Sequence, residues 1–483
     1  MSTIINYRIV LKVISRNLFI LSASLLVCVG IGMIYSEDIL PFVFSALIAL
    51  ALGLGFAIIP ILNKEKTNLQ LKDAYLTVTL SWFIISIIGS LPYIFSGSIP
   101  SFVNAFFESV SGFSTTGASI LTDVEVLPKS ILFWRSLTHW IGGIGIIVLV
   151  IIVMPTLKIG GYHLFTMESS LQDKIQPKIK AVGLRILIIY IGLTVAEIVL
   201  LLVGKMSLFD SVCHAFGTVA TGGFSTKNSS IINYSPYIQY VIMLFMFLAG
   251  TNFVIHYYLL KRNFDKVKEN EEFKFYFIIV FIIGAVVSSV LFFQMDKPFE
   301  TSVREAFFQV ISIITCTGFA SADYLLWPVF GWAVIFFCMF LGGSTGSTAG
   351  GIKMARHLIA LKNLSRIFRQ IISPNAILKI RLNKKIISNE TNNSILTFMM
   401  VYLLIFIAGS LALVLIGIDG KTASSAVATC MAGIGPGIGT VGPVSNFAHL
   451  PDMGKYILSF LMLVGRLEIY TVLVLFTRNF WMK

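Results

Sequence analysis

Long and short apolar runs alternate along this chain. An apolar run of about 20 residues can cross a bilayer as a helix, whereas a run of about 10–14 residues is more often re-entrant or buried. The first two long runs, near residues 17–35 and 41–62, predict a pair of transmembrane helices. The run after Arg16 is long enough to span and has no small-residue cleavage site, so it predicts a helix rather than a signal peptide.

After this pair, a unit of long run, short run and long run occurs four times. The long runs lie near 74–96 and 131–154, 182–203 and 237–260, 273–294 and 328–341, and 394–417 and 454–477. The short runs lie at 102–113, 208–219, 303–314 and 422–433. We therefore predict a helix pair over residues 1–70 and four repeats over 71–160, 181–262, 272–372 and 392–483.

The repeats also match in detail. The sequence Asn-Ala-Phe-Phe-Glu at 104–108 matches Glu-Ala-Phe-Phe-Gln at 305–309, and each stands at the same distance before a Thr-Gly pair. The ends of the second long runs align so that Arg466 falls at the place of three glycines, Gly143, Gly250 and Gly343. One glycine follows each short run, and the four are Gly117, Gly222, Gly318 and Gly435.

Composition places these runs in a membrane. Hydrophobic residues make up 56% of the 483 and charged residues only 12%, with a mean hydropathy of +0.88, whereas a soluble domain carries about 25% charged residues. The fold class predicted is therefore an all-α membrane protein. If each long run crosses once from an inside N-terminus, 27 of the 36 Lys and Arg residues fall inside. This bias predicts cytoplasmic termini and short segments that enter from outside.

Each short run would thus enter and leave the membrane by the same face. Backbone at that depth must be buried in protein or line a water-filled cavity, and glycine lets successive carbonyls turn toward one axis. The turns contain no charged residue, so a ring of carbonyls that favours K⁺, or K⁺ with some Na⁺, is expected rather than a divalent-cation or anion pore. The predicted filter residues are Thr115, Thr116, Gly117, Ala220, Thr221, Gly222, Cys316, Thr317, Gly318, Gly433, Ile434 and Gly435.

A glycine- and hydroxyl-rich segment at 342–353 interrupts the third repeat. So many glycines and hydroxyls will not sustain a helix in lipid, so the segment must line a cavity or pack against protein. The alternative is that it is a flexible hinge with no role in the pathway. It is not a phosphate-binding loop, because no Gly-Lys-Ser/Thr follows at the required spacing. Arg466 lies deep in the last long run, where a charge is costly, and we expect it to face the axis beneath the turns. A structural ion pair, for example with Glu468, is the alternative. The segment and the arginine form a second candidate site, which comprises Gly342, Gly343, Ser344, Thr345, Gly346, Ser347, Thr348, Ala349, Gly350, Gly351, Lys353 and Arg466.

Other polar groups have two interpretations each. Glu108, Asp210 and Glu305 flank the short runs and would either attract cations or cap and pair helices. Single histidines at 139, 214 and 256 are expected to pack and hydrogen-bond. The basic stretch 356–385 fits a lipid-facing cytoplasmic surface or a docking site for a cytosolic partner. The five cysteines have neither metal-ligand nor disulfide spacing, and we find neither a nucleic-acid motif nor a catalytic constellation.

These motifs resemble the Trk/Ktr/HKT superfamily of potassium-uptake proteins, which includes fungal and plant relatives. The resemblance covers nearly the whole chain and rests on the segments Cys316–Phe319 and Gly435–Gly439. The leading helix pair is similar to the TrkH branch. Against the Thr-Val-Gly-Tyr-Gly of tetrameric potassium channels the turns are degenerate, which implies looser selectivity.

The resemblance implies K⁺ uptake across the bacterial cytoplasmic membrane, with the 342–353 segment as an intramembrane gate. It also implies a homodimer in membrane lipid, no covalent cofactor, and a TrkA-type cytosolic regulator that would bind the nucleotide, ATP/ADP or NAD. The alternative is an alternating-access carrier coupled to Na⁺ or H⁺. Such a carrier needs intramembrane ionisable groups, and this chain offers few beyond Arg466 and Glu197.

Overall fold

The protein is described here from a computed structural model that covers residues 5–61, 71–148, 175–376 and 378–482. The fold is helical. The sheet in the described part of the chain is a small antiparallel hairpin of two strands with two residues each, β1 (Arg381–Leu382) and β2 (Lys385–Ile386). Six described helices are long and apolar enough to cross a membrane, or up to eight when two bent pairs are each taken as one span. The all-α membrane fold is therefore confirmed.

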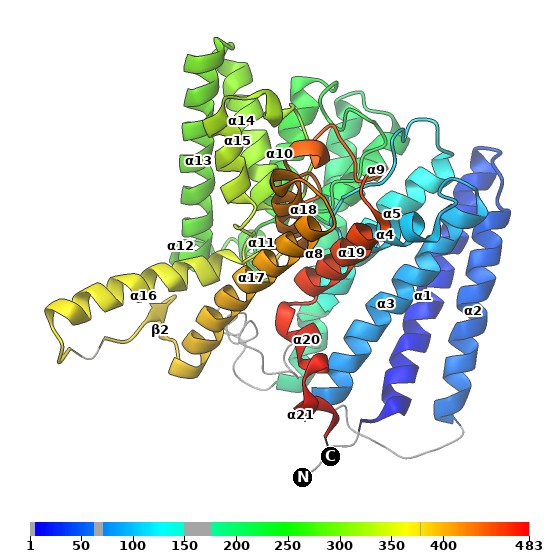
Figure 1. Ribbon diagram of the computed structural model, residues 1–483, viewed down its shortest axis with the longest axis horizontal. Helices are drawn as coiled ribbons and strands as arrows, with labels where there is room; N and C mark the ends of the chain where they lie inside the picture. The colour runs from blue at the N-terminus through cyan, green and yellow to red at the C-terminus, as the bar shows by residue number, and fades with distance from the viewer. Residues whose placement is uncertain (1–4, 62–70, 149–174, 377, 483) are drawn as a thin grey trace.

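The N-terminal pair consists of α1 (Tyr7–Ile34) and α2 (Leu40–Ile61), which lie at one edge of the molecule (Figure 1). Lipid gives no hydrophobic reason for two apolar helices to associate, so polar bonds and small residues serve instead. The hydroxyl of Ser15 donates to the carbonyl of Gly53 (2.7 Å) and that of Ser22 to the carbonyl of Ala46 (3.0 Å). Both helices of the pair pack against the first repeat.

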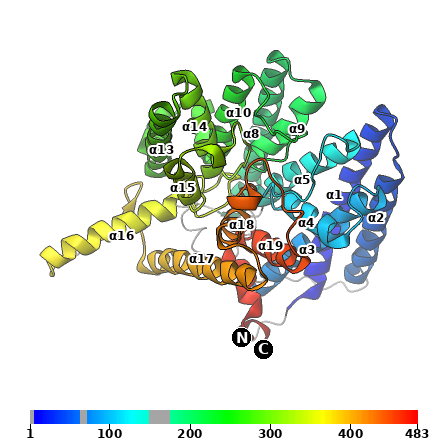
Figure 2. The same cartoon turned by 45° about the horizontal axis from the view of Figure 1, so that its top comes forward.

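Four units of long helix, short helix and second helix follow, and they surround a common centre (Figure 2). The long first helices are α3 (Leu71–Phe95), α8 (Ile175–Val203), α13 (Glu271–Met295) and α17 (Asn389–Leu415). The short helices are α4 (Phe102–Phe113), α9 (Leu208–Val219), α14 (Phe299–Ile314) and α18 (Gly420–Ala432). The four short helices lie where the short apolar runs predict them.

The second helices differ from the prediction of continuous spans. The predicted span 237–260 is α10 (Pro236–Ala249) and α11 (Phe253–Leu260), bent by 103°, and 454–477 is α19 (Asp452–Arg466) followed by α20 (Ile469–Leu473) and a 3₁₀ turn (Val474–Phe476), bent by 114°. Asn252 caps α11, and Glu468 has a positive φ of 61°. Apolar composition continues through both breaks, which is why hydropathy did not reveal them.

The second helix of the third repeat, α15 (Val329–Cys338), ends before the predicted 341, and the glycine-rich segment follows it. The chain then continues as α16 (Met354–Ile372), an arm that projects from the body (Figure 1). In the first repeat the last described helix is α5 (Lys129–Val148), because the rest of the predicted span 131–154 and the predicted boundary at 160 lie outside the described residues. A short α12 (Phe264–Glu269) precedes α13, and α21 (Arg478–Trp481) closes the chain.

A buried ion pair ties the broken last helix to the arm. The carboxylate of Glu468 lies 2.5 Å from the guanidinium of Arg356 at the start of α16, and both side chains are largely buried, at 17% and 4% exposed. The same guanidinium lies 3.7 Å from the ring centre of Phe398. Removing one partner of a buried pair leaves an uncompensated charge, which is usually more harmful than losing the pair itself.

We therefore expect Glu468→Ala to destabilise the fold by about 3 kcal/mol, visible as a lower temperature of aggregation in detergent. Glu269→Ala is the matched control, because the partner of Glu269, Lys384, is 80% exposed, and solvent-exposed pairs contribute little. Equal aggregation temperatures for the two variants would contradict the prediction.

Candidate functional site

The four turns that follow the short helices share one backbone conformation. In each turn, two residues separated by one have positive φ. They are Thr115 (53°) and Gly117 (80°), Thr221 (55°) and Gly223 (80°), Cys316 (59°) and Gly318 (79°), and Gly433 (73°) and Gly435 (97°). Three of the first positions are not glycine, so the chain accepts local strain there, as functional backbone often does.

This conformation corrects the alignment of the second repeat. The residue equivalent to Gly117 is Gly223, not Gly222, and the predicted trio Ala220, Thr221 and Gly222 shifts by one to 221–223. The residue before each second position donates its N–H to the carbonyl five residues earlier: Thr116 to Ser111 (2.9 Å), Gly222 to Gly217 (2.7 Å), Thr317 to Ser312 (2.8 Å) and Ile434 to Thr429 (3.0 Å). Two adjacent glycines made the Thr-Gly match ambiguous.

The glycines of the four turns meet in a closed ring. A Cβ atom on Gly117 would overlap the carbonyl oxygen of Gly222 in the second repeat. The same holds for Gly223 against Thr317, for Gly318 against Ile434 and, more loosely, for Gly435 against Thr116. The contacts run from the first repeat to the second, third and fourth and back to the first. The four turns therefore surround one axis, and only a residue without a side chain fits at each contact.

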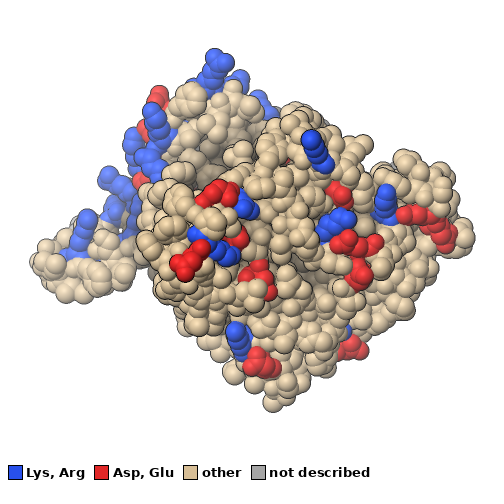
Figure 3. All heavy atoms as spheres, turned by 90° about the horizontal axis from the view of Figure 1, so that it is seen from above, with Lys and Arg blue, Asp and Glu red and all other residues tan. Residues whose placement is uncertain are grey.

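One face of this ring, which we call its outer side, opens into a depression. Its lining includes the four ring glycines together with Phe224 and Pro436, which follow two of them. The face of the molecule seen in Figure 3 carries acidic and basic side chains around its middle. On the outer loop of the first repeat, a hydrogen bond from the amide of Asn228 (2.7 Å) lowers the pKa of Asp123 below its usual range, so this carboxylate stays charged at neutral pH.

The segment 342–353 lies on the other face of the ring, which we call its inner side. The hydroxyl of Thr348 donates to the carbonyl of Val219, the last residue of α9 (3.0 Å). The Cα of Gly350 packs against the carbonyl of Ala432, the last residue of α18, and a Cβ on Gly351 would lie 3.5 Å from the sulfur of Cys316. The segment thus contacts the inner ends of the second, third and fourth turns.

The breaks in the neighbouring helices hold this segment. The N–H of Ser344 donates to the carbonyl of Gly250 (2.8 Å), and the N–H of Phe253 donates to the carbonyl of Gly346 (3.2 Å). Both partners lie at the 103° bend between α10 and α11. The bend therefore leaves the carbonyl of Gly250 and the N–H of Phe253 free to bond the segment, whereas in a continuous helix both groups would form hydrogen bonds within the helix.

Arg466, at the end of α19, donates from Nη1 to the carbonyl of Thr348 (2.7 Å). It is 7% exposed, and its Nε and Nη2 have no hydrogen-bond partner among the described residues. Gly142 and Gly465 occupy equivalent places, because each packs against a carbonyl near the end of its short helix, α4 or α18. The residues that follow them, Gly143 and Arg466, are therefore equivalent too, as the sequence alignment predicts. The alternative ion pair with Glu468 does not form, because Glu468 binds Arg356.

Glu272, near the start of α13, is a residue that sequence reasoning missed. Its Oε1 accepts the N–H of Thr345 (2.7 Å) and the N–H of Ala355 (2.9 Å), so one carboxylate holds both ends of the segment. The side chain is buried, at 1% exposed. In the sequence Glu272 is one of two acids in the first turn of a helix, where the helix dipole commonly favours acidic residues. No local signal in the sequence therefore distinguished it as a functional residue.

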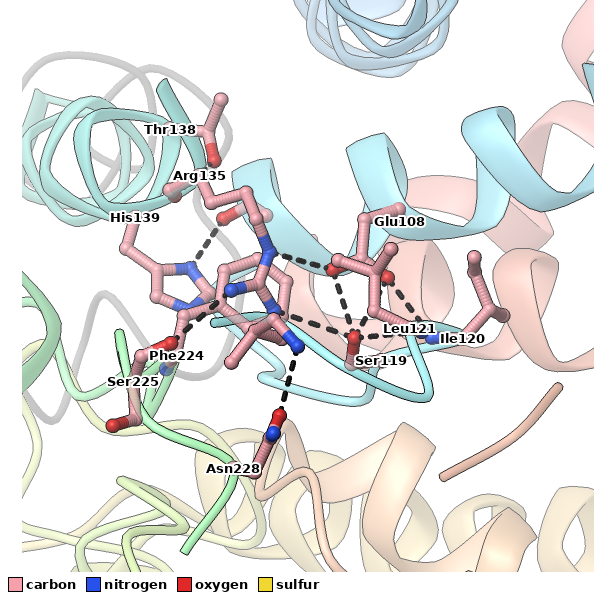
Figure 4. Close-up of polar contacts among 12 residues, drawn as sticks. Glu108, Ser119, Ile120, Leu121, Arg135, Thr138, His139, Phe224, Ser225 and Asn228 are labelled. Carbon is pink, nitrogen blue, oxygen red and sulfur yellow. Dashed lines mark hydrogen bonds and ion pairs between the residues drawn. The ribbon is translucent and has the colours of Figure 1, made fainter. Parts of the chain in front are cut away.

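Glu108 takes part in a buried cluster beside the ring (Figure 4). Its carboxylate accepts from Nε of Arg135 on α5 (2.9 Å), from the hydroxyl of Ser119 and from the N–H of Ile120 (2.9 Å). Arg135 also reaches the second repeat, where Nη1 donates to the carbonyl of Ser225 (3.2 Å). Of the two interpretations of Glu108, the structure supports pairing, since the side chain is fully buried.

The other polar candidates are also engaged within the fold. Asp210 accepts from Ser207 (2.8 Å) and Thr226 (2.6 Å), and Glu305 pairs with Lys297 (2.6 Å). The three histidines are buried and hydrogen-bonded to carbonyl groups, as packing residues are expected to be. Nε2 of His139 also accepts the N–H of Phe224 (3.2 Å), just after the second turn. No cluster of His, Cys, Asp or Glu that would hold a metal occurs in the described ranges.

Fold and site together define a class: helical membrane proteins in which four re-entrant turns of one chain enclose a single axis. A sequence model of the TrkH family, described as a cation transport protein, matches residues 46–482. The chain is 34% identical to the Trk system potassium uptake protein TrkH of Escherichia coli, over 99% of each chain, and 35% identical to TrkI of Halomonas elongata, over 90% of each. The crystal structure of the potassium transporter TrkH from Vibrio parahaemolyticus superimposes with a TM-score of 0.91 at 30% identity, covering 99% of this chain and 100% of that one.

The chain therefore belongs to the TrkH family of cation transport proteins. It is a transport protein and not an enzyme, and the resemblance seen in the sequence is confirmed.

The corrected register makes a testable distinction between two adjacent glycines. Gly223→Ala would have to adopt a φ near 80° and overlap the backbone carbonyl oxygen of Thr317. Gly222→Ala needs no positive φ, but its Cβ would lie 2.5 Å from the ring of His139, which would have to shift. We expect Gly223→Ala to reduce cation flux into proteoliposomes more than tenfold, roughly as Gly117→Ala does, because 2 kcal/mol or so of local distortion is about thirtyfold in an equilibrium. Gly222→Ala should retain more cation flux than Gly223→Ala. If Gly222→Ala instead lost more flux, the sequence alignment of Gly222 with Gly117 would be correct.

Proposed function

We propose that this protein takes up K⁺ across the bacterial cytoplasmic membrane through the ring formed by its four turns. The closed ring of backbone contacts carries the proposal, because carbonyl groups converge there without a charged residue in any turn. Two relatives, a potassium uptake protein and a potassium transporter, are named for the same ion. The filter residues are those expected from the sequence, with Thr221, Gly222 and Gly223 in the second repeat.

In this proposal the ion enters from the outer depression and exchanges its hydration water for carbonyl oxygens. Neutral carbonyls favour a monovalent cation, because a divalent ion gains more from an acidic ring. The ring is degenerate, with Ala118, Phe224, Phe319 and Pro436 after the four glycines, so its preference for K⁺ over Na⁺ is expected to be moderate.

The segment 342–353 and Arg466 form the gate of the proposed pathway. The segment packs against the inner ends of three turns, and the guanidinium that holds it carries a positive charge with two donors free of partners in the described chain. Such a charge at the inner end repels a cation and stabilises the closed position of the segment. Opening requires that the Thr348 carbonyl leave Arg466, and Glu272 would then act as the point about which the segment moves.

The cytoplasmic side is assigned to both termini and to α16, on the bias of Lys and Arg. Blue side chains gather toward the projecting arm in Figure 3. We propose that the chain is a homodimer and that it works with other components of a Trk system, as the names of its relatives indicate. A cytosolic TrkA-type partner would bring the nucleotide. Helix α16 is a suitable docking site for this partner, because the helix directly follows the proposed gate and exposes apolar residues such as Phe368 (57%) and Ile372 (83%).

The alternative, a carrier coupled to Na⁺ or H⁺, rests on one observation. Glu197 in α8 is fully buried, and neither of its carboxylate oxygens has a hydrogen-bond partner among the described residues. An intramembrane acid of this kind is a candidate coupling group by default. It lies on a first helix of a repeat and outside the ring contacts, which favours the passive pathway.

Reversal potentials in opposed K⁺ and Na⁺ gradients separate these functions. The purified protein, reconstituted with and without its cytosolic partner and ATP, should give a current that reverses near the K⁺ equilibrium potential and needs no co-ion. Net K⁺ transport against the electrochemical gradient of K⁺, driven by an imposed H⁺ or Na⁺ gradient, would establish the carrier instead. Glu197→Gln should leave a passive K⁺ current unchanged and abolish a coupled one.

Arg466→Ala tests the gate. The change removes a hydrogen bond from a charged donor, worth about 1.5–3 kcal/mol, and so should raise basal Rb⁺ uptake about tenfold. Shortening the 342–353 segment should act in the same direction. Arg478→Ala, at an exposed arginine of the same repeat, is the control and should not change uptake. Unchanged or slower uptake in both gate variants would rule out the proposed gate.

A further inference from the structure

A second ring of contacts encloses the first on its outer side. It involves the residues two positions after the ring glycines, Ser119, Ser225, Ala320 and Gly437. The backbone carbonyl of each accepts a hydrogen bond from the preceding repeat. Arg135 Nη1 donates to Ser225 (3.2 Å), the N–H of Ile231 to Ala320 (3.0 Å), the hydroxyl of Tyr324 to Gly437 (2.6 Å), and the N–H of Phe447 to Ser119 (2.8 Å).

We call these four hydrogen bonds the outer girdle. They run in the same circular direction as the glycine contacts, from the first repeat to the second, third, fourth and back. Each pair of neighbouring turns is thus joined twice, once by a close backbone contact and once by a hydrogen bond. No turn can move away from the axis without stretching a girdle bond on each side of it.

Each short helix also holds its own turn from behind. Glu108 bonds Ser119 (3.0 Å) and His214 bonds Ser225 (3.0 Å), at equivalent positions in the first two repeats. The third and fourth repeats use an amide and a hydroxyl for the same purpose: Gln309 donates to the carbonyl of Ala322 (3.1 Å), and Ser425 to that of Ile438 (2.8 Å). In each of the four repeats a polar side chain of the short helix therefore holds the chain that follows the ring glycine.

The girdle donors are of two kinds. Ile231 and Phe447 donate from the backbone, whereas Arg135 and Tyr324 donate from side chains. Tyr324 lies in a 3₁₀ turn (Tyr324–Leu326) capped by Asp323, and its side chain is fully buried. Arg135 is 2% exposed and is neutralised by Glu108, with the ring of Phe224 at 4.1 Å from its guanidinium carbon.

We propose that Arg135 and Tyr324 are specificity-determining residues that hold the outer end of the filter at a width suited to K⁺ and not to Na⁺. This inference rests on the proposed function. A carbonyl ring discriminates between the two ions only while its oxygens resist closing on the smaller one. Neither side chain touches the ion; both act through the carbonyls of the neighbouring repeat.

Tyr324→Phe removes the hydroxyl that donates one girdle bond and keeps the ring of the side chain. We expect the K⁺/Na⁺ permeability ratio, from reversal potentials of reconstituted protein, to fall about fivefold. This is about 1 kcal/mol at 1.4 kcal/mol per tenfold, the usual net worth of a buried hydrogen bond. Tyr402→Phe is the matched control, because Tyr402 is also buried but its hydroxyl has no hydrogen-bond partner in the described ranges.

The proposal is overturned if Tyr324→Phe conducts K⁺ with an unchanged permeability ratio, or if Tyr402→Phe shifts the ratio equally. A protein in which even the unaltered chain passes no K⁺ refutes the proposed function instead, so the two failures are distinguishable. If Tyr324→Phe does not yield monodisperse protein, Arg135→Lys serves as the second variant. It keeps the charge opposite Glu108 but has a single nitrogen that cannot reach both Glu108 and Ser225, so the ratio should again fall severalfold while K⁺ conduction persists.

Discussion

Backbone that enters a membrane and returns has polar groups with no water to satisfy them, and this constraint shapes the rest of the molecule. The four turns meet it by surrounding one another. Each ring glycine lies so close to the carbonyl of the next repeat that a side chain would not fit. The short helices, the N–H bonds back to them and the long helices that enclose them all serve to bring four turns to that distance.

The ring is symmetric only in its backbone. Side chains around it have diverged, so that the first repeat supplies Arg135 and Glu108, the third the segment 342–353, and the fourth Arg466. The breaks in the second helices follow the same logic. The bend after α10 frees the carbonyl of Gly250 and the N–H of Phe253 for the segment, and the bend after α19 frees Glu468 for Arg356. The four repeats thus share a backbone plan, while the contacts on the inner side of the ring come from the third and fourth repeats.

Charge is distributed according to its burial. Near the ring the buried carboxylate of Glu108 is matched by Arg135 and by two further donors, so the pair adds rigidity without a strong net field. On the inner side Arg466 has no acidic partner in the described chain, so its field remains. Turns without charged residues and a positive inner side would suit the proposed cation pathway with an inner gate.

The sequence by itself determined the membrane class, the four-fold repetition and the positions of the short helices, because hydropathy and residue periodicity are local properties. It also placed the glycine-rich segment and Arg466 together in the candidate site, by alignment of the repeats. Only the tertiary structure decided that Gly223 occupies the place of Gly117, since two adjacent glycines are indistinguishable until φ is known. It likewise decided where the apolar second helices break and which residues hold the turns. Arg135 and Ser225, or Tyr324 and Gly437, are about a hundred residues apart in the chain, and their pairing depends on how the repeats close around the axis.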